Sequence, residues 1–178
     1  MDSSTQQLAE TVAQLIERVS KLERLDRPTP TVLPGASCAI LTKSATQQIN
    51  PTDDVAITFN GEVIDTDNYH NNSTNTSRLT APADGYYLVG GSVVLDSLTD
   101  LKYLQLSIRK NGAAANGDGK TLIQQSAATS TTIGVAFMRV VPMSAGDYVE
   151  LIALNNKSTQ PNAQTSSNGT SFWIFKVG

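Results

Sequence analysis

After its first 35 residues the chain shows short stretches in which apolar and polar side chains alternate, and this pattern limits the fold more than any other. Residues 104–110, LQLSIRK, have a period of two and lead directly into Asn111-Gly112, a dipeptide typical of tight turns between paired strands. No convincing helical period occurs in the same region. Many short strands separated by turn signals predict an all-β sandwich, barrel or jelly roll.

Other segments carry the same signal. In residues 133–138 the side chains of Ile, Val and Phe alternate with Gly, Ala and Met, and residues 149–153 alternate again. Residues 172–177, FWIFKV, are apolar on both faces, as expected of a central strand in a closed assembly.

A turn signal precedes the longest apolar stretch. Residues 82–85, PADG, combine a proline that fixes φ with an Asp-Gly turn, so they predict a rigid corner that leads into an inner strand from Tyr86 onward. Gly90-Gly91 interrupts that strand, and we expect a β-bulge or a close neighbour at this place.

Near its N-terminus the chain has a helical period instead. Over residues 4–26 apolar side chains recur at steps of four and three, with Val at the a positions and Leu at the d positions of a heptad. The stripe covers only about two and a half heptads, which is too short to hold an assembly by itself. The alternative is an amphipathic helix that lies on its own domain. The predicted coiled-coil seam comprises Leu8, Val12, Leu15, Val19 and Leu22.

Proline then separates this helix from the rest of the chain. Residues 28–34 hold three prolines in seven residues, which predicts a stiff, extended strap and therefore favours the coiled coil. We divide the chain into an N-terminal α-helix for coiled-coil trimerisation or anchoring (1–26), a proline-rich linker (27–35) and a β domain (36–178).

Composition excludes several classes of protein. Only 16 % of residues are charged, against about a quarter in an average domain, and this favours self-association. A net charge of -3 without a long basic run gives little support to nucleic-acid binding. One cysteine cannot close an intrachain disulfide. We expect no secretory signal and no membrane span, and hence synthesis in a cytoplasm.

Seven short motifs follow one another in a fixed order. They are FN (59–60), Tyr69, SRLTAP (77–82), DGYYL (84–88), IRKNG (108–112), MSAGDYVEL (143–151) and TSFWIF (170–175). This order resembles the signature of the complement/tumour-necrosis-factor-like domains, and the resemblance spans roughly residues 38–178.

The resemblance implies a ten-stranded jelly roll that forms tight homotrimers through its inner, aromatic faces. The strand after Gly85 departs from the animal family, because it reads LVGG where that family prefers aromatic residues. This variant is similar to domains of bacteriophage virion proteins, and the short coiled coil and proline strap fit a phage head fibre, decoration protein or short tail fibre. The implied trimer core or inner strand comprises Tyr86, Leu88, Phe137, Phe172 and Ile174.

Two polar segments, residues 68–76 and 155–170, are nearly devoid of apolar side chains, so we expect them to stay outside the core as solvated connections or a recognition surface. Asparagines and Tyr69 in the first segment, with Tyr103, could bind sugar by hydrogen bonding and stacking. The predicted recognition residues are Tyr69, His70, Asn71 and Asn72.

No constellation for catalysis is visible. His70 is the one histidine, nothing local supports a dyad with Cys38, and no Gly-x-Ser-x-Gly elbow occurs. We therefore expect no enzyme and no catalytic, cofactor-binding or metal-ligating residue. Calcium is left open, because carboxylates could supply oxygen ligands although their positions match no loop motif. These carboxylates belong to Asp53, Asp54, Asp65 and Asp67.

The sequence thus predicts a non-enzymatic viral structural protein, a homotrimer on the virion surface. Capsid decoration or a head fibre attached through the N-terminal segment is the leading hypothesis. The alternative is a tail-fibre receptor-binding protein, or a carbohydrate- or protein-binding module that recognises the host cell surface. Expected partners are copies of itself, a viral capsid or tail protein and a host surface glycan or protein, with no nucleic acid and no membrane. The expected location is the virion, after synthesis in a bacterial cytoplasm.

Overall fold

The computed structural model describes residues 12, 14, 15, 35–50, 53–98, 104–113, 120–123, 131–155 and 161–178. The chain divides into two compact units, Met1–Gly35 and Ala36–Gly178. Within the described residues, no helix is long and apolar enough to cross a membrane.

In the first unit, Val12, Gln14 and Leu15 are helical, and the side chains of all three are exposed. The other predicted seam residues, Leu8, Val19 and Leu22, and the prolines of the linker lie outside the described residues. The coiled coil over residues 1–26 therefore stays a prediction.

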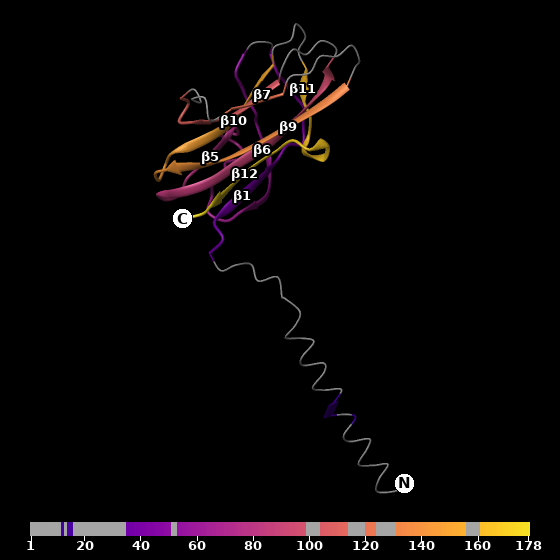
Figure 1. Cartoon of the computed structure of the whole chain (residues 1–178). Coiled ribbons are helices and arrows are strands. Elements are labelled where there is room, and N and C mark those ends of the chain that lie inside the picture. The colour runs from indigo at the N-terminus through magenta and orange to yellow at the C-terminus, as the bar shows by residue number, and fades with distance from the viewer. Residues whose placement is uncertain are drawn as a thin grey trace. The chain divides into compact units, whose positions relative to one another are not determined.

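The second unit is built almost entirely of strands, twelve of them among the described residues (Figure 1). They are β1 (Cys38–Thr42), β2 (Gln47–Gln48), β3 (Val55–Ala56), β4 (Gly61–Asp65), β5 (Arg78–Thr80), β6 (Gly85–Leu98), β7 (Leu104–Lys110), β8 (Lys120–Ile123), β9 (Thr131–Met143), β10 (Tyr148–Asn155), β11 (Asn162–Ala163) and β12 (Ser171–Lys176), with a 3-10 turn η2 (Ser166–Asn168) before β12.

These strands form two antiparallel sheets. In the seven-stranded sheet β9, β6, β12, β1 and β4 lie side by side, with β11 and β2 joined to the far end of β6. In the five-stranded sheet β10 lies at the centre, paired with β7, β5 and β3, and β8 pairs with β7. The predicted all-β jelly roll is confirmed. Of the twelve described strands, β2, β3 and β11 have only two residues each.

The core fills the space between the two sheets and is organised around aromatic pairs. Phe59 stacks on Phe172 with ring centroids 5.7 Å apart, and Tyr69 meets Tyr87 edge-on at 6.2 Å. On β9 the predicted alternation is confirmed, since Val135 is buried and Ala136 and Met138 are exposed. Strand β12 lies between β6 and β1, as its apolar residues on both faces predicted.

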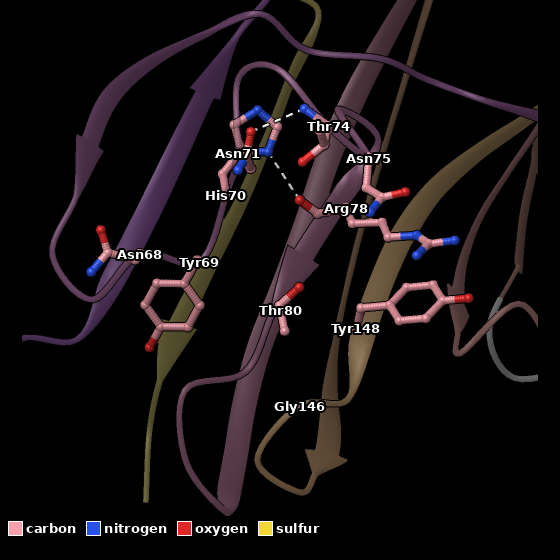
Figure 2. A pocket seen from close by; sticks show the side chains of 10 residues that line it. All are labelled: Asn68, Tyr69, His70, Asn71, Thr74, Asn75, Arg78, Thr80, Gly146 and Tyr148. Atoms are coloured by element: carbon pink, nitrogen blue, oxygen red, sulfur yellow. Dashed lines mark hydrogen bonds between the residues drawn. The ribbon is translucent and has the colours of Figure 1, made fainter.

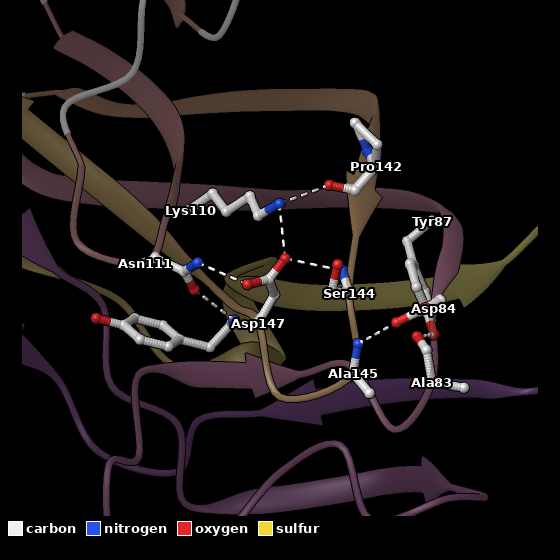
Figure 3. Close-up of polar contacts among 10 residues, drawn as sticks. Ala83, Asp84, Tyr87, Lys110, Asn111, Pro142, Ser144, Ala145 and Asp147 are labelled. Atoms are coloured by element: carbon white, nitrogen blue, oxygen red, sulfur yellow. Dashed lines mark hydrogen bonds and ion pairs between the residues drawn. The ribbon is translucent and has the colours of Figure 1, made fainter.

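The predicted corner before β6 is held by two hydrogen bonds. Tyr87 Oη donates to the carbonyl of Ala83 at 2.6 Å, and the amide of Ala145 donates to Asp84 Oδ1 at 2.8 Å (Figure 3). The first bond binds the inner strand to its own turn, and the second bond ties that turn to the one between β9 and β10. The rigid corner that the sequence predicted is therefore held both by β6 and by the turn between β9 and β10.

Gly90 and Gly91 each admit a close neighbour, on opposite faces of β6. A Cβ atom on Gly90 would lie 2.6 Å from Cη2 of Trp173, and one on Gly91 would lie 2.7 Å from Cδ2 of Leu151. The pairing of β6 with β9 and β12 is regular at both positions. The close-neighbour prediction is thus confirmed and the bulge is wrong.

A polar clip joins the turn at Asn111-Gly112 to the turn before β10. Asp147 accepts hydrogen bonds from Lys110 Nζ at 2.7 Å, Asn111 Nδ2 at 2.7 Å and the amide of Ser144 at 2.8 Å (Figure 3). These bonds, the one from Lys110 foremost, hold the pKa of the Asp147 carboxyl well below its usual range. Asn111 and Gly112 both adopt the left-handed conformation, with φ of 50° and 70°, which is the turn geometry that the sequence predicted.

The prediction that both polar segments stay outside the core is wrong at several places. In the first segment Tyr69 and His70 are buried, and in the second Asn155, Ala163 and Thr170 are buried. Asn155 satisfies its amide inside the protein, because Nδ2 donates to the carbonyls of Ile49 and Asn50 at 2.9 and 3.1 Å. Polar side chains enter a core when such partners are present, and these partners are distant in the sequence.

Candidate functional site

Large apolar side chains of the second unit that remain exposed gather on the seven-stranded sheet. They lie on β4, β6, β9 and β12 or directly after β12, and comprise Val63, Ile64, Tyr86, Met138, Val140, Phe175 and Val177. Tyr86 is 60 % and Met138 is 63 % exposed. Polar residues usually have such exposed fractions, whereas large apolar side chains such as these are usually covered.

Strand pairing assembles many of these side chains into continuous rows. Leu88 of β6 lies opposite Val140 of β9 and opposite Phe175 of β12. Two residues further along β6, on the same face, Gly90 lies opposite Met138 of β9 and opposite Trp173 of β12. Residues directly opposite in a sheet project from the same face. We call the resulting surface the apolar face, made of Tyr86, Leu88, Met138, Val140, Trp173 and Phe175.

Gly90 shapes the centre of the apolar face. Because it has no side chain, the indole of Trp173 lies across β6 and reaches toward Met138. The ring of Trp173 is in turn fixed by Phe175, whose ring meets it edge-on with centroids 5.6 Å apart. Beside the indole is a hollow of about 320 Å³ lined mainly by apolar atoms of Gly91, Ser92, Ala136, Phe137, Met138 and Trp173.

The chemistry of this surface suits protein contact rather than catalysis. A contiguous exposed apolar patch marks an interaction site, and covering one large apolar side chain stabilises a complex by roughly 1.5–3 kcal/mol. The hollow beside Trp173 adds shape complementarity to the buried apolar area, because a side chain of a partner can enter it.

The sequence assigned trimer-core residues only partly to this surface. Tyr86 and Leu88 lie on the apolar face, but Phe172 and Ile174 are fully buried inside the sandwich and Phe137 packs against its core. Their burial agrees with the assignment of Phe172 and Ile174 to an inner strand. The inward parity of these two residues on β12, and of Phe137 on β9, sets all three side chains apart from the apolar face. Sequence reasoning missed Met138, Val140, Trp173 and Phe175, the neighbours on the opposite parity, although the two-faced apolar character of residues 172–177 was a signal for the last two.

Two of the predicted recognition residues are buried and two are exposed. Tyr69 is 1 % exposed and its hydroxyl bonds to that of Ser37, so its ring is not offered to a ligand. His70 is 9 % exposed, and its Nδ1 donates to the carbonyl of Arg78 at 3.0 Å, since a carbonyl only accepts (Figure 2). Asn71 and Asn72 are exposed. Tyr69 and His70 therefore hold the loop in place, which corrects their assignment as recognition residues.

Two of the four carboxylates considered for calcium are engaged in structure. Asp54 pairs with Arg109, and the carboxylate of Asp65 accepts the amides of Tyr69 at 2.9 Å and His70 at 3.0 Å. Over the described ranges, no group of three His, Cys, Asp or Glu side chains could hold a metal ion. Burial, above all, raises the pKa of the Cys38 thiol, which is the opposite of what a reactive cysteine requires.

No protein-family model matches the chain. A curated relative, the uncharacterized protein YqcC of Bacillus subtilis strain 168, is 30 % identical over 122 residues, which cover 66 % of this chain and 32 % of that protein. The chain thus spans about a third of the length of the relative that it matches.

Solved structures give a clearer result. The globular domain of zebrafish complement 1qA superposes with a TM-score of 0.58 at 14 % identity, over 80 % of this chain and 98 % of that one. Murine APRIL at pH 5.0 superposes with a TM-score of 0.56 at 12 % identity, over 80 % of this chain and 99 % of that one. The chain has a complement/tumour-necrosis-factor-like jelly-roll fold. At these identities the likeness establishes the fold and nothing more.

Proposed function

We propose that this chain is a non-enzymatic structural and binding module that self-associates through the apolar face into a homotrimer on the surface of a virion. The observation that carries the proposal is the gathering of exposed apolar side chains on one sheet. The low charged fraction of 16 % supports it, because a protein that covers part of its surface with copies of itself needs fewer charges.

The virion role is supported by two features of the sequence. The LVGG strand after Gly85 is similar to the variant in bacteriophage virion proteins, and the heptad pattern of residues 4–26 offers a second contact between chains. Under this proposal the N-terminal segment attaches to the capsid and the jelly roll forms the decoration or head fibre.

Self-association is tested by the mass of the full chain in light scattering at micromolar concentration. We expect three times the mass of one chain, and one chain for Met138→Glu, because a charge buried in an apolar contact is costly. Gln105→Glu adds the same charge to the five-stranded sheet and should leave the mass unchanged. A wild-type mass equal to one chain would overturn the proposal.

Attachment is tested separately by deleting residues 1–26. We expect the truncated protein to remain trimeric and to be lost from the particle, whereas Leu15→Asp with Val19→Asp should disrupt the seam alone. Unchanged occupancy of the truncated protein in a particle reconstruction, or wild-type density only at a tail tip, would refute the decoration role.

A further inference from the structure

A second hollow lies beside β5 and β10 of the five-stranded sheet, and Figure 2 shows the residues that line it. It measures about 420 Å³, within the usual range of roughly 300–1,000 Å³ for ligand pockets. Its floor is formed by Arg78 and Thr80 of β5 and Tyr148 of β10, and Thr80 lies directly opposite Tyr148 in the sheet. We call it the β5 pocket.

The wall of the β5 pocket comes from the loop between β4 and β5, which supplies Asn68, Asn71, Thr74 and Asn75. This loop is fixed by its own hydrogen bonds. The amides of Ser73 and Thr74 both donate to Asn71 Oδ1 at 2.9 Å, and the amide of Arg78 donates to the carbonyl of Asn75 at 2.9 Å. The wall is therefore held in position before any ligand arrives, which lowers the cost of ordering on binding.

The lining is polar and carries a single fixed charge. Among the ten residues around the pocket Arg78 is the one with a permanent charge, and none is acidic. Glu150 Oε1 accepts a hydrogen bond from Nε of Arg78 at 3.4 Å. In the described part of the chain neither Nη atom of Arg78 has a hydrogen-bond partner. The two free Nη groups are suited to a carboxylate or a phosphate, which match the planar guanidinium.

Stacking is not the basis of recognition here. The guanidinium of Arg78 covers the ring of Tyr148, with Cζ 3.9 Å from the ring centroid. What remains for a ligand are amide and hydroxyl groups on the wall and floor, which hydrogen-bond to hydroxyls.

We propose that the β5 pocket binds a sugar or polyol unit that carries a carboxylate or phosphate group. The anion is held by the Nη groups of Arg78, and the hydroxyls are held by Thr80 and the asparagines of the wall. Since this pocket and the apolar face lie on different sheets, binding does not depend on the proposed self-association.

The test is titration calorimetry of the full chain with four probes: glucuronate, glucose, glycerol 1-phosphate and inorganic phosphate. We expect glucuronate or glycerol phosphate to bind at least tenfold more tightly than glucose and inorganic phosphate. The stronger of the two charged probes separates an acidic sugar from a polyol phosphate. Added salt should weaken this binding, because an exposed charge contact is screened.

Two variants locate the site. Arg78→Gln should reduce the affinity for the charged probe at least tenfold, to that of glucose, and Thr80→Val should reduce it severalfold while preserving the shape of the strand residue. Ser73→Ala is the matched control, because Ser73 is exposed on the same loop, donates to Asn71 through its backbone amide and does not line the pocket. If Arg78→Gln fails to fold, the Thr80→Val result decides.

Three outcomes would overturn the proposal. If glucuronate and glucose bound with equal affinity, and glycerol phosphate bound no more tightly than they did, the claim that the ligand is charged would be refuted. Equal affinity for glycerol phosphate and inorganic phosphate, with glucuronate binding no more tightly than either, would indicate a simple anion site. Full binding by both folded pocket variants, or equal loss by Ser73→Ala, would place the ligand elsewhere.

Discussion

The two outer faces of the sandwich expose different kinds of side chain to solvent. The seven-stranded sheet exposes Tyr86, Met138 and Phe175, whereas the five-stranded sheet and its flanking turns carry the ion pairs of Arg78 with Glu150, Arg109 with Asp54, and Lys110 with Asp147. Exposed ion pairs contribute little to stability, about 0–1 kcal/mol each, but they keep a surface soluble. Under the proposed self-association, the polar face is complete in a single chain and the apolar face is covered by neighbouring chains.

The same alternation produces both faces, so a change of one position along a strand changes what a residue does. Inward side chains determine whether the chain folds, and under the proposed function outward side chains on the apolar face determine whether chains assemble. Substitutions at neighbouring positions therefore separate folding from assembly.

The largest contrast is expected between two aromatic residues of β12. Phe172→Ala should lower the free energy of unfolding by about 3–5 kcal/mol, because Phe172 is fully buried against Phe59. Phe175→Ala should leave the fold of one chain nearly unchanged, since Phe175 is 36 % exposed, but should weaken self-association. Urea unfolding and light scattering at several protein concentrations measure the two effects. Equal loss of folding stability in both variants would contradict the division into faces.

A smaller contrast is expected between the adjacent glycines of β6. Gly91→Ala should cost about 1–3 kcal/mol of stability, because its Cβ would press on Leu151 and on the carbonyl of Ser171, 2.7 Å away. Gly90→Ala should instead displace the indole of Trp173, weaken assembly and change the fluorescence of the chain's single tryptophan.

Gly134→Ala is the matched control for both glycines, since among the described residues its Cβ would meet only Val94 Cγ2, at 3.4 Å. It should leave stability, mass and fluorescence close to those of the wild type. Normal assembly of Gly90→Ala with an unchanged emission spectrum would show that the indole does not shape the contact.

The smallest effect is expected on the polar side, at Asp147. Its pKa is lowered in the folded state, so its stabilising effect is fully present above the unfolded pKa of about 3.9 and is lost as pH falls toward the folded value. Asp147→Asn should lower the melting temperature at pH 7 and flatten its decline below about pH 4. Lys110→Met should do the same to a lesser degree, because two hydrogen bonds to Asp147 remain. A melting curve of Asp147→Asn with the wild-type acid dependence would argue against the clip.

Much of the fold could be predicted because it depends on local chemistry. The alternation of residues 104–110, the turn at Asn111-Gly112 and the corner before β6 all act over a few residues, and the structure confirms them. What the pattern left open was parity. Tyr86 and Tyr87 are adjacent and chemically alike, and a shift by one residue exchanges the two faces of a strand. Tyr87 lies inward because its hydroxyl finds the carbonyl of Ala83 and its ring finds Tyr69.

The β5 pocket and the buried loop tyrosine were less accessible to prediction. Tyr69 lies in a polar segment, and its burial depends on Ser37 and Tyr87, which are far from it in the sequence. The pocket joins Arg78 to Tyr148 across the β5–β10 pairing, a contact between segments some seventy residues apart. No short motif encodes such a contact, so only the topology reveals it.

The place of β12 has a consequence for biosynthesis. This strand is translated after all the other described strands, yet it lies between β1 and β6 and pairs with both, Cys38 with Phe175 on one side and Gly91 with Phe172 on the other. A nascent chain without residues 171–176 leaves two long hydrogen-bonding edges open. Closure of the seven-stranded sheet therefore waits until translation has passed β12, and chaperones or neighbouring nascent chains have that interval in which to bind the open edges.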